Sequence, residues 1–119
     1  MRIPARSDYA LRAMVAIAGT GDTYVKAVTL SDDEAIPLEF LQNILRDLRR
    51  AGLLVAQRGY EGGYRLARPA REITVSAVLQ AVGSPLTEPY EGAESVWDVL
   101  EATASGVLGS TTLADLVDR

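Results

Sequence analysis

Hydrophobic residues recur at helical spacing in the segment between Pro37 and Gly52. The apolar positions follow one another at i, i+3, i+4 and i+7, a pattern that places them on one face of an α-helix. This face carries Leu41, Ile44, Leu45 and Leu48. Proline is favoured at the first helical position, and glycine takes the left-handed conformation that ends many helices. The pattern therefore predicts a helix that begins at Pro37 and ends before Gly52.

Polar side chains cover the opposite side of this predicted helix. They are Glu39, Gln42, Asn43, Arg46, Arg49 and Arg50. Carboxamide, carboxylate and guanidinium groups read base edges in the major groove of DNA or bind its phosphates. The same groups are common on helix faces that contact only water. The helix by itself leaves both interpretations open.

A β-hairpin is expected directly after the glycine. Residues 53–57 change from apolar to polar, and residues 64–66 alternate in the way that strands do. Between them lie one arginine and three glycines that permit positive φ angles or close backbone approach. These turn residues are Arg58, Gly59, Gly62 and Gly63. A plain hairpin with incidental arginines gives the same pattern. A helix followed by a short basic hairpin is also the arrangement of a winged helix-turn-helix, whose helix enters the major groove of DNA while the wing contacts the backbone or the minor groove.

The first third of the chain predicts two more helices. Ser7 is a favoured N-cap for a helix that runs to about Ala18 and ends at Gly19. A short second helix is expected to begin at residue 26 or 29 and to end with the acidic run 31–34. This run places negative charge close to the surface that is expected to face DNA.

The second half predicts further helices and a loop. Thr74 is expected to cap a helix that ends at residue 82. Residues 84–94 are expected to form a loop, and a long helix follows to about Leu108, with Ser110 capping a short last helix. The predicted fold class is mainly α with a small β-hairpin wing: a winged helix-turn-helix plus a long C-terminal helix.

The long helix has an apolar face of its own. The residues near this face are Val96, Val99, Leu100, Thr103, Val107 and Leu108. In a chain of this size, such a face covers the core of the same molecule or pairs with a second copy. Trp97 is either an anchor of that interface or part of the core. The pattern does not separate these alternatives.

Composition indicates one small folded domain, or one domain with an appended helix, in a chain of 119 residues. Hydrophobic residues make up 48% and charged residues 24%, so the chain is not of the disordered class. It has no apolar run of about 18 residues, as a membrane-spanning helix requires, and it does not open with a secretory signal. We therefore expect a cytoplasmic protein without membrane contact.

Charge is divided unevenly along the chain. The net charge is −4, but residues 1–71 carry +3 and residues 72–119 carry −7. Because the local field steers a protein towards phosphates, a basic first part is compatible with DNA binding. The acidic second part is expected to face away. Arg2 and Arg6 are expected to precede the first helix and to add phosphate contacts.

Several separate motifs occur in the order of one known family. They are Met1-Arg-Ile, Ser7-Asp8-Tyr9-Ala10-Leu11-Arg12-Ala13, Ile36-Pro37-Leu38-Glu39-Phe40-Leu41-Gln42-Asn43-Ile44-Leu45, Ala51-Gly52-Leu53, Arg58-Gly59 and Gly62-Gly63-Tyr64-Arg65-Leu66-Ala67. From residue 1 to about 86 the chain resembles the bacterial Rrf2-type regulators, which include the iron–sulfur regulator IscR, the nitric-oxide sensor NsrR and the cysteine-metabolism repressor CymR.

The resemblance implies a dimeric winged-helix transcription factor that binds a palindromic operator in double-stranded DNA. Residues 1–83 would form the DNA-binding domain, 84–94 a shortened loop, and 95–119 the dimerisation helix and C-terminal tail. The long helix pairs across a two-fold axis in this family.

Roles for the polar residues follow from this interpretation. Glu39, Gln42, Asn43 and Arg46 are candidates for base edges, and Arg49 and Arg50 for phosphates. At the wing, Arg58 would enter the minor groove beside the three turn glycines. Contacts to the DNA backbone are expected from Ser7, Tyr9 and the segment from Arg2 to Arg6.

The chain contains no cysteine and no histidine. In iron–sulfur sensors of the family, three cysteines in the loop before the long helix hold the cluster. Here that loop, residues 87–94, is shorter and offers neither thiolate nor imidazole, the usual cluster ligands. Asp8 matches a carboxylate ligand of the nitric-oxide sensor, but alone it cannot hold a cluster. Near a helix N-terminus, its negative charge instead interacts favourably with the helix dipole. We expect no cluster, no metal and no other cofactor.

Two functions from different classes remain. The first is a sequence-specific transcription regulator, a homodimeric repressor. The second is a winged-helix protein-interaction module that docks a partner through its acidic half. An enzyme is not expected, since no histidine base and no nucleophile motif are present. The effector would be a small molecule or a protein, and Tyr90 and Trp97 would either line a ligand pocket or simply pack.

Overall fold

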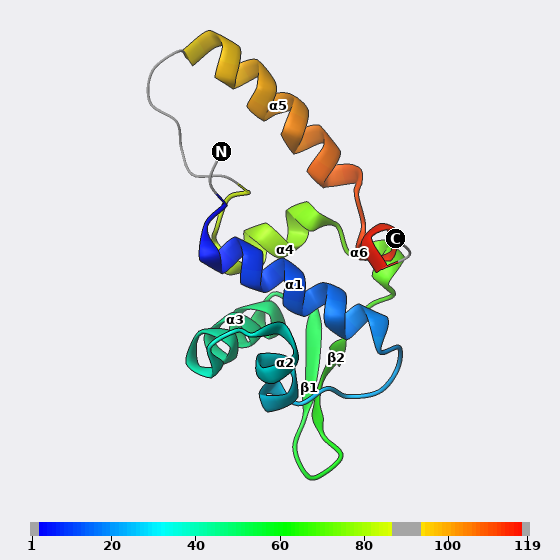
Figure 1. Ribbon diagram of the computed structural model, residues 1–119. Helices are drawn as coiled ribbons and strands as arrows, with labels where there is room; N and C mark the ends of the chain where they lie inside the picture. Colours follow the sequence, from blue (N-terminus) through cyan, green and yellow to red (C-terminus); the bar gives the residue numbers. More distant parts are fainter. Residues whose placement is uncertain (1–2, 87–93, 118–119) are drawn as a thin grey trace.

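Helix α1 (Ala5–Gly19) crosses the middle of the molecule, and most other elements pack against it (Figure 1). The computed structural model describes residues 3–86 and 94–117, except for the side chains of residues 94–99 and 101. After α1 come α2 (Ala27–Glu34), α3 (Leu38–Arg50), β1 (Leu54–Gln57), β2 (Gly63–Leu66), the 3₁₀ turn η1 (Ala70–Glu72), α4 (Val75–Val82), α5 (Glu94–Ser110) and α6 (Leu113–Val117). The fold is mainly helical with one two-stranded antiparallel hairpin, as the sequence predicts.

The start of α1 differs from the prediction. The helix begins at Ala5 with Pro4 in the N-cap position, so the prediction of Ser7 as N-cap is wrong. Ser7 lies within the first turns and is fully buried. Proline is a poor extender of helices but suits their first residues, which explains why the helix begins there. Arg6 is also helical, so it does not belong to an arm that precedes the helix.

Helix α3 begins one residue later than predicted and ends as predicted. Pro37 is its N-cap rather than its first helical residue. At the other end, Gly52 has φ +81°, and its N–H donates to the carbonyl of Arg49 at 3.0 Å. The N–H of Leu53 donates to the carbonyl of Leu48, also at 3.0 Å. These two bonds form a Schellman motif, and the buried side chains of Leu48 and Leu53 lie at its two ends.

The hairpin pairs Leu54 with Leu66 and Gln57 with Gly63 in antiparallel register. Near its turn, strand β2 gains a third strand-like residue from another part of the chain. Val25 and Tyr64 exchange two backbone hydrogen bonds of 2.8 Å each. The hairpin is therefore tied to the segment that precedes α2, a connection that the sequence pattern does not predict.

The C-terminal part returns to the helical domain after α5. Residue Thr111 accepts a hydrogen bond from the N–H of Val75 at 2.9 Å, and the N–H of Leu113 donates to Ile73 at 2.9 Å. Leu113 is fully buried in the common core. The last helix is capped by Thr112, whose Oγ1 accepts from Asp115 N at 3.3 Å. The expected cap Ser110 is instead the last residue of α5.

One hydrophobic core holds these elements together. The α3 stripe predicted from the sequence is wholly inside it, and its four residues are fully buried. Helix α4 has the expected Thr74 cap, whose Oγ1 accepts a hydrogen bond from Ala77 N at 3.1 Å, and it ends at Gly83 with φ +63°. The core members come from α1, α2, α3, β1 and α4, from the connections between elements, and in one case from α6: Ala10, Ala13, Met14, Ile17, Leu30, Ile36, Leu41, Ile44, Leu45, Leu48, Leu53, Leu54, Ile73, Val78, Val82 and Leu113.

Candidate nucleic-acid interface

Helices α2 and α3 and the turn between them form a helix-turn-helix. The turn passes through Ala35, which has φ +54° and ψ +46° in the left-handed region. The Oγ of Ser31 donates to the carbonyl of Ile36 at 2.6 Å, while Ile36 itself is buried. Arg12 of α1 donates through Nη1 to the carbonyl of Glu34 at 2.6 Å. Glu34 is the last residue of α2, and a positive charge at the C-terminal end of a helix interacts favourably with the helix dipole. The polar second helix is thus held by hydrogen bonds in addition to its buried Leu30.

The outer face of α3 is open to solvent along its whole length. All six predicted contact residues on this helix are exposed: Glu39, Gln42, Asn43, Arg46, Arg49 and Arg50. Phe40, which the sequence analysis did not single out, is also 61% exposed, and its ring meets that of Tyr9 edge-on at 6.3 Å between centroids. Arg49 and Arg50 lie in the last turn, where cations are favoured by the dipole. The helix therefore presents one acidic, two amide and three guanidinium groups to the outside.

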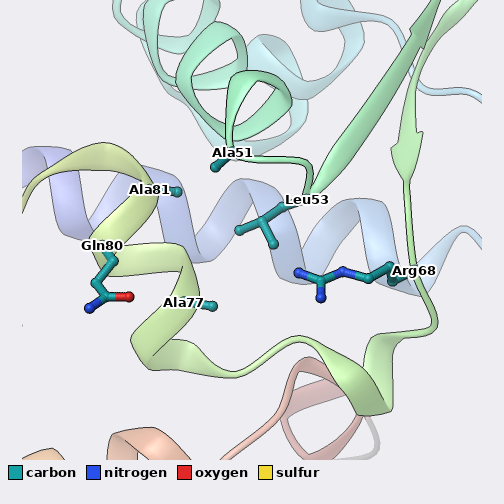
Figure 2. Close-up of a pocket in the computed structure, with 6 residues that line it drawn as sticks. All are labelled: Ala51, Leu53, Arg68, Ala77, Gln80 and Ala81. Carbon is teal, nitrogen blue, oxygen red and sulfur yellow. The ribbon is translucent and has the colours of Figure 1, made fainter.

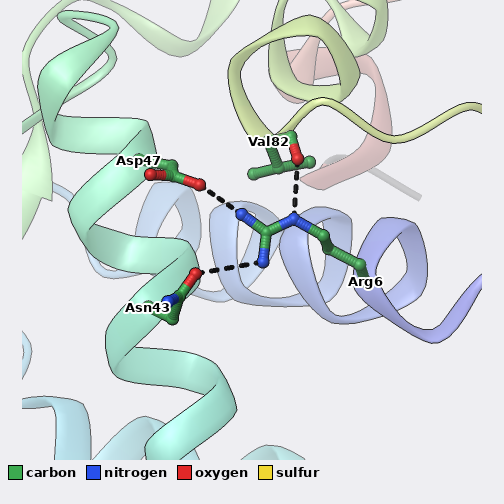
Figure 3. A network of polar contacts seen from close by, with 4 residues as sticks. All are labelled: Arg6, Asn43, Asp47 and Val82. Atoms are coloured by element: carbon green, nitrogen blue, oxygen red, sulfur yellow. Dashed lines mark hydrogen bonds and ion pairs between the residues drawn. The ribbon is translucent and has the colours of Figure 1, made fainter.

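A polar network joins the N-terminus of α1 to the middle of α3 and the end of α4 (Figure 3). Arg6 Nε donates to the carbonyl oxygen of Val82 at 2.6 Å, and Nη1 donates to Oδ1 of Asn43 at 3.2 Å. The third nitrogen, Nη2, donates to the carboxylate of Asp47 in a salt bridge. Arg6 therefore serves these intramolecular contacts, and the prediction that it is a free phosphate contact before the first helix is corrected. Arg2 lies outside the described residues.

Ser7 and Tyr9, the other residues of α1 that were predicted to contact the DNA backbone, lie in different environments. The hydroxyl of Ser7 donates within the protein, to Ser84 Oγ at 2.6 Å and to the carbonyl of Pro85. Because Ser7 is fully buried, its side chain is not exposed for a contact with the DNA backbone. Tyr9 is half-buried, and the guanidinium carbon of Arg12 lies 5.5 Å from the centre of its ring. Of the two, Tyr9 alone reaches the surface.

The wing ends in a turn of four residues. The N–H of Gly62 donates to the carbonyl of Gly59 at 3.0 Å, so Tyr60 and Glu61 occupy the tip. Tyr60 is 92% exposed and points into solvent, a feature that the sequence analysis missed. Arg58 is exposed and precedes the turn.

The glycines of the wing have structural roles that explain their presence. Gly63 has φ +138°, and a Cβ there would lie 2.5 Å from the carbonyl oxygen of Val25. A Cβ on Gly62 would overlap the backbone of Gln57 across the turn. Gly59 has φ +106° with open space around it. These residues permit the sharp turn and the close approach of the hairpin to residue 25.

The lone lysine of the chain, at the N-cap of α2, also contacts the wing. Lys26 Nζ donates to the carbonyl of Gly59 at 2.9 Å and lies 3.5 Å from the carbonyl of Gly62. Arg65, on the returning strand, stacks over Tyr24, with 4.7 Å between its guanidinium carbon and the ring centre. Both contacts join the wing to the segment before α2. No local pattern in the sequence predicts these two contacts.

Helix α5 extends away from the wing, at the opposite end of the molecule (Figure 1). On its described part, Leu100 is 51% and Val107 57% exposed, and Leu108 is half-buried. Thr103 lies on its exposed surface. The side chains of Val96, Trp97 and Val99 lie outside the described residues. An apolar strip of α5 is therefore left uncovered by the chain itself.

A shallow hollow of about 310 Å³ lies between the end of α3, Arg68 after the wing and helix α4 (Figure 2). It is lined by Ala51, Leu53, Arg68, Ala77, Gln80 and Ala81. None of these residues was predicted to bind a ligand. Tyr90 and the side chain of Trp97, the predicted pocket walls, lie outside the described residues, so that pocket stays a prediction.

The donor groups of the chain do not fit an iron–sulfur cluster. The chain has no cysteine and no histidine. Within residues 3–86 and 94–117, no three carboxylates gather into a group that would hold a metal ion.

None of the helices in the described part has the length and apolar run that a membrane crossing requires.

Comparison with known proteins gives a consistent result. The sequence profile of the Rrf2 family, described as an iron-dependent transcriptional regulator, matches residues 3–119. A Mycobacterium tuberculosis protein that carries the name of an HTH-type transcriptional regulator is 41% identical over 130 aligned positions, covering 98% of this chain and 81% of the relative. The HTH-type transcriptional regulator IscR of Cereibacter sphaeroides is 32% identical, over 98% of this chain and 87% of its own.

Solved structures show the same architecture. CymR, described as the global cysteine regulator of B. subtilis, superposes with a TM-score of 0.85 at 26% identity, over 99% of this chain and 97% of that one. IscR of T. potens gives a TM-score of 0.86 at 28% identity, over 99% and 87%. The arrangement of α2, α3 and the hairpin is therefore a winged helix-turn-helix like that of CymR and IscR.

Proposed function

This chain belongs to the Rrf2 family of transcriptional regulators, and we propose that it is a sequence-specific, homodimeric DNA-binding repressor that works without an iron–sulfur cluster. The observation that supports this most strongly is the combination of an exposed polar α3 with a hairpin wing that is hydrogen-bonded to the segment before α2. A helix for the major groove and a wing for the flanking backbone are then held on one rigid core. An HTH-type regulator without thiolate or imidazole ligands needs another source of regulation.

Helix α3 supplies the base contacts in this proposal. Glu39, Gln42, Asn43 and Arg46 would face base edges, because they are exposed and project from the first three turns. Arg49 and Arg50, at the C-terminal end, would bind phosphates where the helix leaves the groove. Side-chain amides and guanidinium groups distinguish bases by their donor and acceptor patterns.

The wing supplies contacts on the flanking DNA. Arg58 precedes the turn and would enter the minor groove, where a guanidinium is attracted by the phosphates on both sides. Gly59, which has open space around it, would let the backbone of the wing approach the DNA closely, while Gly62 and Gly63 shape the turn. Tyr9 would contact the DNA backbone beside α3.

Helix α5 would make the dimer. The exposed Leu100 and Val107 are seven residues apart, so they share one face of the helix. The proposed interface adds Val96, Trp97, Val99, Thr103 and Leu108. Two-fold pairing through residues 95–119 would place two copies of the winged domain, residues 1–83, on the two halves of a palindromic operator.

Repression and its release complete the proposal. A dimer bound over a promoter excludes polymerase from it, and an effector other than iron would release the dimer. The loop 84–94, with Tyr90 and Trp97, is the proposed place for a small-molecule or protein effector. It joins the winged domain to α5, so a change there acts on both.

The test is selective DNA binding by protein purified in the presence of a metal chelator. Duplex DNA from the region upstream of its own gene would be compared with a scrambled duplex of equal length and composition, by fluorescence anisotropy. We expect at least a thousandfold tighter binding to the upstream DNA, because specific regulators bind their sites about 10³–10⁷ times more tightly than non-specific DNA. Equal affinity for the two duplexes, with and without added iron, would refute the proposal.

A further inference from the structure

We propose that Arg6 is a positioning residue that sets base specificity: it fixes Asn43 as a hydrogen-bond donor towards DNA and so directs it to guanine. The inference rests on the proposed function, since it names the base that one residue of α3 recognises. It comes from the contacts of Arg6, which touch a residue on the exposed face of α3 (Figure 3).

The chemistry of the contact determines the orientation of the Asn43 carboxamide. A guanidinium group has only donors, so the atom of Asn43 that faces it must be the oxygen. Arg6 Nη1 indeed donates to Oδ1, at 3.2 Å. A half-turn of the amide would put its NH₂ group against a cation and lose this bond. The Nδ2 amide NH₂ is therefore the group of Asn43 that remains to donate to an external partner.

Arg6 is itself fixed and cannot follow Asn43 in such a turn. Its Nε donates to the carbonyl of Val82 at the end of α4, at 2.6 Å. Its Nη2 forms the salt bridge with Asp47, one helical turn after Asn43 on the same side of α3. The guanidinium is a planar fork, and three acceptors on two helices hold all its nitrogens in one orientation.

A fixed NH₂ group distinguishes guanine from adenine in the major groove. Guanine presents two neighbouring acceptors there, N7 and O6, which match the two hydrogens of the amine. Adenine presents the acceptor N7 and the donor N6, and asparagine pairs with both only when its oxygen is free to accept. In this protein that oxygen is directed towards Arg6 and accepts from it, so the NH₂ group and not the oxygen is the part of the carboxamide that is turned to an external partner. Asn43 is therefore matched to guanine rather than to the adenine that an unconstrained asparagine favours.

The experiment is enrichment of bound sequences from a randomised duplex library with the full chain. The base that Asn43 reads is the operator position where preference disappears in Asn43→Ala. We expect guanine at that position for the native protein. In Arg6→Met, which removes every donor, the amide turns freely, and the ratio of guanine to adenine affinity should fall at least tenfold.

A matched control separates this effect from loss of stability. Arg12→Met also removes an α1 arginine that holds a helix by a carbonyl contact, but Arg12 does not touch Asn43. It should leave the preferred base unchanged. If Arg6→Met does not fold, Asn43→Asp at an exposed position keeps Arg6 and removes the donor, and it should abolish the guanine preference.

Four results would overturn the inference. They are adenine at the Asn43-dependent position of the native protein, an unchanged preference in folded Arg6→Met, a retained guanine preference in Asn43→Asp, and a selected operator with no Asn43-dependent position. In each case selective DNA binding would still stand. A library that yields no enriched sequence would instead overturn the proposed function, and this inference with it.

Discussion

Lys26 Nζ donates a hydrogen bond of 2.9 Å to the carbonyl oxygen of Gly59, so the residue before α2 braces the turn at the end of the wing. The two residues are 33 positions apart in the chain. The same segment pairs with the wing through Val25 and Tyr64. The wing is therefore a part of the helix-turn-helix framework and not an independent hairpin.

Replacing this lysine should loosen the turn. Lys26→Met removes the donor to Gly59, and for an exposed charged group that contact is worth about 0.5–1 kcal/mol. We expect amide hydrogen exchange at Gly62, whose N–H bonds to Gly59, to become about two- to fivefold faster in the free protein. Lys26→Arg keeps a donor of similar reach and serves as the control. Equal exchange in all three proteins would show that Lys26 does not brace the wing.

A methyl group at Gly63 should damage the fold. Gly63→Ala forces a positive φ on alanine and places its Cβ 2.5 Å from the carbonyl oxygen of Val25. We expect the free energy of unfolding to fall by more than about 3 kcal/mol, measured by urea denaturation. Gly59→Ala, with a positive φ but open space, should cost only about 1–3 kcal/mol. Equal costs would mean that the approach to Val25 is not tight.

The turn between α2 and α3 should accept glycine. Ala35 lies in the left-handed region, where an alanine costs roughly 1–2 kcal/mol and glycine costs little. Glycine also makes the unfolded chain more flexible, which offsets about 0.4–1 kcal/mol of the gain. Ala35→Gly should therefore leave the free energy of unfolding unchanged or raise it by up to about 1.6 kcal/mol. Ala102→Gly, on the exposed surface of α5, should lower it by about 0.5–1 kcal/mol, and an equal loss at residue 35 would contradict the turn geometry.

The proposed dimer interface can be tested by charge. Two carboxylates introduced as Leu100→Glu and Val107→Glu would lie on one exposed face of α5 and repel their partners across the two-fold axis. We expect the double variant to sediment as a monomer at concentrations where the native chain is a dimer. Ser105→Glu, an exposed residue of the same helix off that face, should remain dimeric. A double variant that stays dimeric would place the interface elsewhere.

Much of this architecture is predictable from local sequence. Among helices α1 to α5 in the described part of the chain, α3 has the most one-sided apolar stripe, and its four leucine and isoleucine residues are all fully buried. Thr74 and Gly52 act as predicted, because capping depends on residues only a few positions apart. The exposure of the outer α3 face follows from the same period. These features are decided within one helix.

Contacts between residues that are far apart in the chain are not predictable from local sequence. Ser7 has the residue type of an N-cap, but its buried hydroxyl bonds to the half-buried Ser84, 77 positions away. Arg6 likewise meets Val82 and Asp47, and the sequence gives no sign of either contact. The Ser110 prediction failed for a local reason, since Thr112 and Asp115 form the reciprocal cap that the pattern already contains.

The most direct test of DNA binding is the salt dependence of affinity for the upstream duplex, measured by fluorescence anisotropy between about 50 and 200 mM salt. A dimer that neutralises phosphates through Arg49, Arg50 and Arg58 should lose affinity steeply, with a slope of about −0.9 in log affinity against log salt for each phosphate. Arg58→Ala should make that slope shallower by about 1 for each wing that binds. An affinity that does not change with salt, or an Arg58→Ala slope equal to the native one, would contradict a wing and helix that hold DNA.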